Sequence, residues 1–537
     1  MSPEDKFPFG LVGLLGQPVI GDLAKEYAGV VADLRSHDPV LTAASFGALL
    51  VLPDLQANCY RIEALVHLAS GYCQGRTAPG IGLVKRCFER LGNGSCGPAE
   101  DPAEDVFVSL VSTPNGNFRI FEGIREGTAF YLQRVLDVVQ RLPAHCCTAG
   151  LLEKIDSLLK LSEAVAERLG VREKTLGEEM PCENMTQKVA GKLPSARSCI
   201  RFSERDLAAL QISPTALSDL VFNPRDAEDL ATHTIGHSEL ERRPLAFHGN
   251  AVYLLLPPAV ATAITRLVIE SILHTDTAAI FEGSLCLEYR RLFRETPLLG
   301  GGTRVDMMFQ KLTGGSISSG MAEVDSGRFL HLVWVVDGLD EFGTAGGLAG
   351  GNANPAELSA AVEHLLSRAS TEAKGRTGFR SGITLVVGCG YGRGLYFGGD
   401  AVPSEWRLEL VSAYDLVTLA WLGNFDTLSL WRLLDSQEAL ARSGVELMNT
   451  NGLLNLVAWS RQLGGHVVAH GKLPDGFVDS SRKHLIVVEQ NARSVLQWCE
   501  YVYVLREGQL AFQGTADECR ANEELVKQYL SIGVGKK

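Results

Sequence analysis

The sequence predicts a multidomain α/β protein, with a mainly helical N-terminal unit, a central mixed-sheet α/β core, and a C-terminal part that is helical and α/β. Three observations lead to this fold class. The 537 residues exceed what one ordinary hydrophobic core accommodates, and apolar residues recur at helical spacing through much of the first 170 residues. Three short β-branched or aromatic runs also follow one another between residues 303 and 342, separated by Gly- and Ser-rich turns.

The composition indicates a folded protein, because 46% of residues are hydrophobic, 21% are charged, and no long polar tract reads as disordered. The formal charge of −13 gives nucleic acid no broad electrostatic footprint, although a local basic patch is compatible with it. Twelve cysteines without a CxxC pair indicate neither a zinc ribbon nor a disulfide framework. We therefore expect reduced thiols in a cytoplasmic protein.

Membrane insertion is not expected from the sequence. The N-terminal segment MSPEDKFPFG is acidic and lacks a basic region followed by an apolar one, and no run of 18 uninterrupted apolar residues occurs. We predict a soluble, unsecreted chain. The domains predicted along it are 1–170, mainly helical; 171–258, a linker with a small α+β unit; 259–400, the α/β core; 401–484, a helical unit; and 485–537, a C-terminal tail.

The N-terminal domain is predicted as packed helices with one hairpin. Apolar residues at three- and four-residue spacing mark the helices, and Asn115-Gly116 fits the turn between two alternating strands. Gly170 is the expected C-cap of the last helix. The predicted helices are 43–52, 57–75, 81–91, 128–141 and 151–169, and the predicted strands are 106–111 and 118–121.

The second segment begins with residues 171–200, which are polar and broken by Gly and Pro and therefore read as a linker. Ser203 then fits the N-cap of a helix, and residues 243–256 resemble a hairpin turning at His248-Gly249-Asn250. Helices over 259–274 and 280–293 are expected to lead into the core.

The core is predicted as a three-stranded meander over Val305–Gln310, Ser318–Val324 and Phe329–Val336, followed by a helix over 356–373 and a strand over 383–387. The third strand of the meander lacks polar alternation, so both of its faces should be covered, as in a central strand flanked by helices. Residues 404–463 are predicted to be helical, with their tryptophans buried. Beyond residue 485 we expect strand, helix, hairpin and helix.

The order helix, three strands, helix, strand over residues 260–390 resembles the core of the PD-(D/E)xK nuclease superfamily. In that resemblance Asp306 matches the first acidic position and Glu323 matches the acid of the ExK element. Clustered carboxylates of this kind hold a divalent cation that activates water, so the resemblance implies Mg²⁺ or Mn²⁺. Asp325 stands where the family has its lysine. The candidate catalytic and metal-binding residues are Asp306, Glu323 and Asp325.

The segment Leu485–Leu530 contains VEQNA, YVL-x-x-G, GT-x-x-E and a final YL in that order, and it resembles the C-terminal end of the ATP-binding subunits of branched-chain amino-acid ABC transporters. The resemblance implies that Gln490 occupies the position that touches the γ-phosphate. Upstream, the chain has no GxxxxGK[ST] loop to cradle phosphates and no LSGGQ-like signature. We therefore expect no tight binding of ATP or GTP and assign no cofactor-binding residue.

Other motifs have ordinary structural interpretations beside their functional ones. The segment LVWVVDGLDE, ending at Glu341, looks like a Walker B strand; the alternative is that its acids are solvated helix-cap residues. The segment LVVGCGYGRG, over 385–394, resembles the glycine-rich motif of S-adenosylmethionine-dependent methyltransferases; the alternative is an ordinary strand end. His331 lies in an apolar run and is interpreted as a core or edge histidine. The pairs His233/His237 and His466/His470 have i, i+4 spacing but are not in helical surroundings, so surface or structural roles are expected.

These observations lead to one functional hypothesis and two alternatives. The leading hypothesis is a nuclease-like core, metal-dependent or degenerate, that acts on or near nucleic acid. The first alternative is a non-enzymatic assembly or scaffold subunit, favoured by the helical flanks, the acidic charge and the missing lysine. The second is a nucleotide-binding relative of ABC ATPases. Nucleic acid and protein are the candidate partners; the substrate and the oligomeric state are not predicted.

Overall fold

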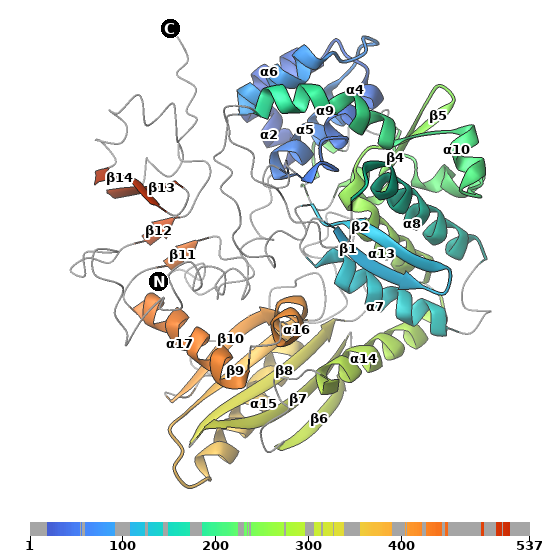
Figure 1. The fold of residues 1–537 in the computed structure, drawn as a ribbon. Helices are drawn as coiled ribbons and strands as arrows, with labels where there is room; N and C mark the ends of the chain where they lie inside the picture. The colour runs from blue at the N-terminus through green and yellow to red at the C-terminus, as the bar shows by residue number, and fades with distance from the viewer. Residues whose placement is uncertain are drawn as a thin grey trace. The chain divides into compact units, whose positions relative to one another are not determined.

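The structure is a computed structural model of the chain, drawn in Figure 1. It describes residues 19–442 with gaps, together with 446–448, 485–487, 501–506 and 509–515. The gaps are 54, 56–58, 92–107, 124–126, 143–148, 172–184, 224–229, 234, 236–237, 273–274, 296–304, 313–314, 326, 338–354, 389–402, 404 and 422–425.

The chain divides into two compact units, each built from segments that are not consecutive. Unit 1 comprises Met1–Gly16, Arg134–Pro143 and Ile269–Val488, and unit 2 comprises Gln17–Gln133, Ala144–Val268 and Glu489–Lys537. The five consecutive domains expected from the sequence stay a prediction. The mixture of helices and several sheets confirms the predicted α/β fold class.

Unit 2 begins with packed helices, as the apolar spacing predicts. The helix α4 packs against α5, and α3 packs against both α5 and α6. A Cβ atom on Gly47 would lie 2.0 Å from the Leu255 carbonyl oxygen, so glycine permits the close approach of α4 to that segment. The helices are α2 (Ile20–Glu26), α3 (Ala28–Leu34), α4 (Pro39–Gly47), α5 (Cys59–Tyr72) and α6 (Ile81–Leu91).

A hairpin of β1 (Val108–Thr113) and β2 (Gly116–Phe121) follows, with the turn at the predicted position. It packs on α8 (Ala149–Leu169), and the preceding helix α7 (Thr128–Arg141) has residues in both units. Gly170 adopts φ +69°, and the amides of Gly170 and Val171 donate to the carbonyls of Glu167 and Ala166. This paired arrangement ends α8 and confirms the predicted C-cap.

The prediction of a linker over 171–200 is wrong in its second half, where α9 (Met185–Cys199) forms. Pro194 lies inside this helix, although proline removes a backbone donor and disfavours helix interiors. Leu193 and Ala196 are buried, and α9 packs against α6 and α8. Tertiary packing therefore outweighs the low helix propensity that suggested a linker.

The rest of unit 2 is a small α+β region. Its antiparallel sheet has the order β3-β5-β4, and the predicted hairpin turn contains Gly249 at φ +59°. Ser203 caps α10 as predicted, in a reciprocal arrangement with Asp206. The elements are β3 (Arg201–Ser203), α10 (Glu204–Ala209), η4 (Pro214–Leu220), α12 (Glu239–Arg242), β4 (Leu245–His248), β5 (Ala251–Leu254), η6 (Pro257–Ala259) and α13 (Val260–Ile272), whose last residues lie in unit 1.

Unit 1 contains a five-stranded mixed sheet in the order β10-β9-β8-β7-β6, visible in Figure 1 in yellow-green to orange. The predicted meander is antiparallel, whereas β9 pairs parallel to both β8 and β10. The elements are α14 (Thr277–Glu295), β6 (Val305–Leu312), β7 (Gly315–Asp325), β8 (Arg328–Asp337), α15 (Pro355–Lys374), β9 (Ser381–Gly388), β10 (Trp406–Ser412), α16 (Ala413–Trp421) and α17 (Thr427–Arg442).

The central strand β8 is covered on both faces, which confirms the prediction from its apolar sequence. Val333 and Val335 belong to a buried cluster with Val362 of α15. Trp334, with the opposite parity, lies 5.5 Å from Phe293 of α14 between ring centroids. Helices therefore pack on the two sides of this strand, as in a three-layer α/β/α arrangement.

The prediction that residues 404–463 are helical is wrong at β10 and at residues 446–448, which form strands, although α16 and α17 confirm helix nearby. The sequence WRLELVS alternates apolar and charged residues, which is the period of a half-buried strand. Trp406 and Trp431 are buried, as expected; the side chain of Trp421 and residue Trp459 lie outside the described residues.

The C-terminal part is described only at four strands. In unit 1, β11 (Glu446–Met448) pairs parallel to β12 (Leu485–Val487). In unit 2, β13 (Tyr501–Arg506) and β14 (Gln509–Thr515) form the predicted hairpin. The helices expected beyond residue 487 lie outside the described residues.

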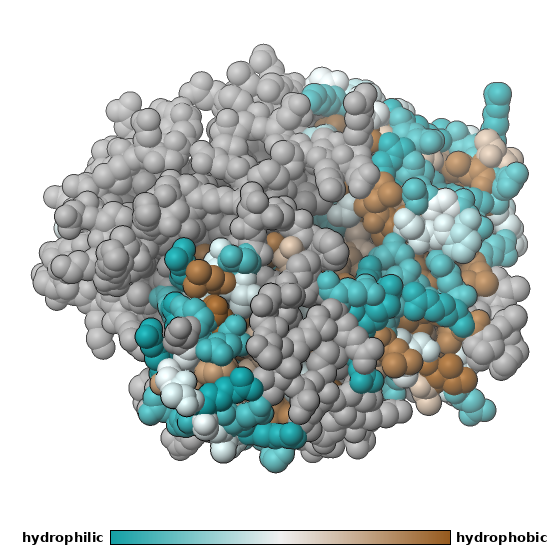
Figure 2. All heavy atoms as spheres, turned by 60° about the horizontal axis from the view of Figure 1, so that its bottom comes forward, coloured by the Kyte–Doolittle hydropathy of each residue, from teal (hydrophilic) through white to brown (hydrophobic). Residues whose placement is uncertain are grey.

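The surface of the described residues mixes polar and apolar side chains, and Figure 2 shows the apolar ones in separate small groups on one face. The exposed large apolar side chains among the described residues are Ile81, Leu152, Phe247, Ile280 and Leu287. No helix in the described parts of the chain is long and apolar enough to cross a bilayer.

Val335→Asp is predicted to destabilise unit 1 by about 3–5 kcal/mol, because it places an unpaired carboxylate among apolar side chains. Leu287→Asp is the matched control: Leu287 is 59% exposed, and the change should cost under about 1 kcal/mol. Thermal and urea unfolding of both variants measures the difference. Equal unfolding curves for Val335→Asp and wild type would contradict the central position of β8.

Candidate functional site

Two of the acidic residues predicted as catalytic lie at the β7–β8 hairpin. Glu323 is exposed and its Oε1 accepts a hydrogen bond of 3.1 Å from the Gly327 amide. Asp325 forms an ion pair with Arg328, which holds the pKa of the Asp325 carboxyl below its usual range. The strand register shifts between Glu323 and Asp325, so the simple alternation that would place both on one face is interrupted.

The third predicted acid, Asp306, lies on β6, and its side chain is outside the described residues. Val305 pairs with Met321, so the backbone places Asp306 three positions from Glu323, roughly 10 Å along the strands. The structure therefore brings Glu323 and Asp325 to one hairpin end and does not place the backbone of Asp306 beside them.

His331 is a core histidine, as the sequence predicts. It is buried on β8, and its Nδ1 lies 3.0 Å from Thr384 Oγ1 of β9, which also accepts a 2.7 Å hydrogen bond from Trp406 Nε1 of β10. Burial lowers the pKa of His331 to about 3. The imidazole is therefore neutral and connects three neighbouring strands.

The remaining motifs are only partly described. His233 lies in a bend outside any helix, where its Nδ1 accepts from the Glu239 amide at 3.4 Å, in agreement with the structural interpretation. His237, His466, His470, Asp340, Glu341, Gln490 and the glycine-rich residues after Gly388 lie outside the described residues.

A group that sequence reasoning missed lies in unit 2, on α5. Glu63 and His67 are four residues apart, so their side chains lie on the same face of this helix. Both side chains are completely buried. An acid and an imidazole in the interior need partners, because burial without them is costly.

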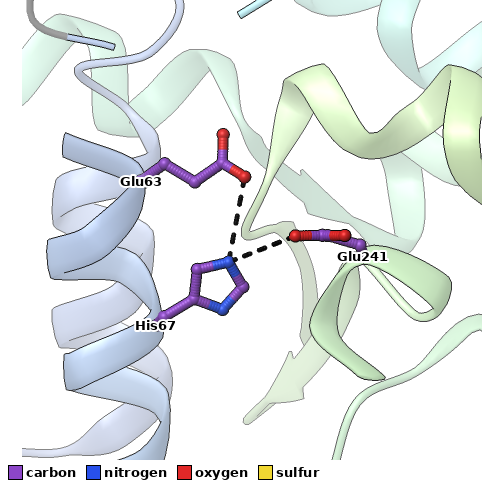
Figure 3. A group of neighbouring side chains, drawn as sticks. All are labelled: Glu63, His67 and Glu241. Atoms are coloured by element: carbon purple, nitrogen blue, oxygen red, sulfur yellow. Dashed lines mark ion pairs between the residues drawn. The ribbon is translucent and has the colours of Figure 1, made fainter. Parts of the chain in front are cut away.

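Glu241, on α12, provides the third member of the group. Ser238 caps this helix: its Oγ accepts from the Glu241 amide at 3.3 Å, while Glu241 Oε2 accepts from the Ser238 amide at 3.3 Å. The reciprocal cap fixes the Glu241 side chain. Its other oxygen, Oε1, is directed at His67, as Figure 3 shows.

The three side chains converge on His67 Nε2. This nitrogen lies 3.5 Å from Glu241 Oε1 and 3.8 Å from Glu63 Oε1, and one ligand atom of each residue lies within 4.8 Å of the others. Neither contact is a hydrogen bond, because Nε2 has no hydrogen-bond partner among the described residues. The group is thus a buried site of two carboxylates and one imidazole (Figure 3).

Two effects on the pKa of His67 oppose each other. Burial disfavours the imidazolium and the carboxylates of Glu241 and Glu63 favour it, with the net result that the pKa of His67 is raised. Ser238 Oγ lies 3.4 Å from the other ring nitrogen, Nδ1, and the Ser238 carbonyl accepts from Arg266 Nη1 at 3.4 Å. Among the described residues, this is where acidic and imidazole groups gather closely enough to hold a cation.

The signal for this site was present in the sequence as Glu63-x-x-x-His67 within a helical pattern. Glutamate and histidine at i, i+4 on a helix lie on one face, just as two histidines with that spacing do. Glu241 carries no comparable signal, because nothing in the sequence relates it to a helix more than 170 residues earlier. Only the fold brings the three together.

One comparison with known proteins is informative. The family described as "Anti-phage protein Upx-like" matches residues 15–497, which is most of the chain. The chain belongs to this family. No curated protein and no solved structure is significantly similar to it. The Upx-like match includes Glu63, His67 and Glu241 as well as the β6–β10 sheet, and it gives no support to the nuclease-like or ABC-type resemblance.

Acidification is predicted to destabilise unit 1 through His331. An unfolded histidine binds a proton near pH 6.5, whereas the folded His331 does so only near its pKa of about 3, so stability is lost as the pH falls through this window. Linkage gives about 2 kcal/mol between pH 7 and pH 5.

His331→Asn is the matched variant, because its amide can bond to Thr384 and does not titrate in this range. Unfolding free energies of both proteins at pH 7 and pH 5 provide the measurement. The variant should lose about 2 kcal/mol less than wild type on acidification; an identical loss would contradict the assignment of a buried, neutral His331.

Proposed function

We propose that this Upx-like chain contributes to anti-phage defence in the cytoplasm as a non-catalytic assembly subunit, in which the β6–β10 sheet is a degenerate nuclease-like core. The observation that carries the proposal is the engagement of the predicted acids in local structure. Glu323 accepts from the Gly327 amide, and Asp325 pairs with Arg328. Carboxylates engaged in this way do not form the open cluster that a catalytic cation requires.

Two further observations favour assembly over chemistry at this sheet. Asp325 stands where a nuclease of the resembled type has its lysine, so the cationic group that assists water is replaced by an acid. The net charge of −13 also gives nucleic acid no long-range attraction. A protein is therefore better supported than nucleic acid as the binding partner of unit 1.

A metal-dependent enzyme acting on nucleic acid is the second candidate. It is favoured by the element order α14-β6-β7-β8-α15-β9 and by the presence of Asp306 and Glu323 on neighbouring strands. In this alternative, Mg²⁺ or Mn²⁺ would bind at Asp306, Glu323 and Asp325, and cleavage would depend on them. A nucleotide-dependent function is disfavoured, because the chain has no phosphate-cradling GxxxxGK[ST] loop.

The double variant Asp306→Asn, Glu323→Gln is predicted to retain protection in a plaque assay against a phage that wild type restricts. The Glu323→Gln substitution keeps an amide oxygen for the Gly327 N–H while removing the charge, so the hairpin contact is preserved. Val335→Asp serves as the control that loses protection through unfolding.

A loss of protection of about 100-fold or more in a folded double variant would overturn the non-catalytic proposal, because removal of a catalytic acid has effects of this order. Cleavage of DNA or RNA by purified wild type with Mg²⁺ or Mn²⁺, abolished in the double variant, would establish the enzyme instead. Retained protection without cleavage supports the assembly subunit.

A further inference from the structure

We propose that Glu63, His67 and Glu241 bind one divalent transition-metal ion, with Zn²⁺ preferred, and that this ion fastens α5 to α12 inside unit 2. The proposal is independent of the acids on the β6–β10 sheet and of whether the chain cleaves nucleic acid. It rests on the geometry of the three side chains, on the hydrogen-bonding state of His67, and on the charge that the group confines.

The spacing of the ligand atoms fits a small tetrahedral ion. Ligands about 2.0–2.1 Å from a tetrahedral centre lie roughly 3.4 Å from one another. The separations of 3.5 and 3.8 Å from His67 Nε2 are close to that value, and neither contact is a hydrogen bond. An ion between the three groups would therefore require only small shifts of side chains that already converge.

The state of His67 agrees with this role. Its Nε2 is completely buried, points between the two carboxylates, and has no hydrogen-bond partner among the described residues. Ser238 Oγ lies 3.4 Å from Nδ1, where it can accept a hydrogen bond from Nδ1–H. In this tautomer the Nε2 lone pair is available to a metal. A second group that orients the imidazole in this manner is a regular feature of histidine ligands.

The chemistry of the group suits a divalent ion. Two carboxylates converge with one imidazole nitrogen in the interior, and a cation that their oxygens coordinate directly offsets part of the cost of burying them. Arg266, buried on α13, donates a 3.4 Å hydrogen bond to the carbonyl of Ser238, the residue that caps α12.

The donor set selects the class of metal. An imidazole nitrogen with two carboxylate oxygens suits zinc and its first-row neighbours, whereas Mg²⁺ and Ca²⁺ prefer oxygen alone. The three side chains have no solvent exposure, which is typical of a structural rather than a substrate-binding centre. A second carboxylate oxygen from Glu63 would complete four-coordination.

The first experiment measures metal in the full chain, purified without chelators, by elemental mass spectrometry. Wild type should retain about one equivalent of zinc. The variants Glu63→Gln and Glu241→Gln preserve the size of the side chain but weaken coordination. Each should contain at least fivefold less zinc per chain than wild type. Glu239→Gln is the matched control, because Glu239 is on the same helix but pairs with Arg242 and Arg243 instead; this variant should retain the metal.

The second experiment needs no substitution and so does not depend on the variants folding. Wild type is stripped with a chelator and titrated separately with Zn²⁺ and Co²⁺. Zinc should raise the melting temperature by several degrees, because a ligand that binds only the folded state stabilises it. Cobalt should give the visible absorption of a tetrahedral site with nitrogen and oxygen ligands.

The proposal is overturned if purified wild type holds less than about 0.1 equivalent of any first-row metal and neither ion changes its melting temperature. It is also overturned if Glu239→Gln loses as much metal as Glu241→Gln. A cobalt spectrum with a thiolate charge-transfer band would place the metal on cysteine and would equally exclude this site.

Discussion

The constraint on which both units depend is that a buried carboxylate must be compensated. Glu288 of unit 1 is completely buried, and Arg291 and Arg141 donate to its two oxygens at 2.5 and 2.7 Å, with Arg134 at 3.7 Å. Burial alone would raise the pKa of Glu288, but these arginines lower it. In unit 2, the buried Glu63 and Glu241 face His67 Nε2 at 3.8 and 3.5 Å, and this nitrogen has no hydrogen-bond partner among the described residues. The buried carboxylates therefore face guanidinium groups in unit 1 and an imidazole in unit 2.

Local chemistry and distant packing contribute in different proportions to the two candidate sites. Glu323 and Asp325 are organised within one hairpin, by partners three or four residues away. Glu63 and His67 come from α5, and Glu241 comes from α12, far along the chain. All three side chains are buried, and the helix cap holds Glu241. The first arrangement stabilises a turn, whereas the second excludes water from charged groups.

Much of the fold was predictable because its signals are local. The burial of β8, the turn at Gly249, and the caps at Ser203 and Gly170 follow from apolar runs and single-residue chemistry. The two errors have different causes: at Pro194 in α9 packing outweighs local preference, whereas at β10 the prediction overlooked an alternation that is itself typical of a strand. For the candidate site, the sequence alone indicates that Glu63 and His67 share one face of a helix, because they are four residues apart. The pairing with Glu241 depends on long-range contacts that no periodicity encodes.

The mixed pairing of the unit 1 sheet also has a consequence for the order in which it folds. Short turns join the antiparallel strands β6, β7 and β8. The parallel strands β8 and β9 are instead joined by a long crossover connection that contains α15, and this connection must form before they pair. Long-range pairing of this kind forms late, because its loop-closure entropy must be overcome before its contacts contribute. During synthesis, β8 therefore presents an unpaired, strongly apolar edge until β9 arrives. That interval is when the chain is most exposed to misassociation with other copies and to recognition by chaperones.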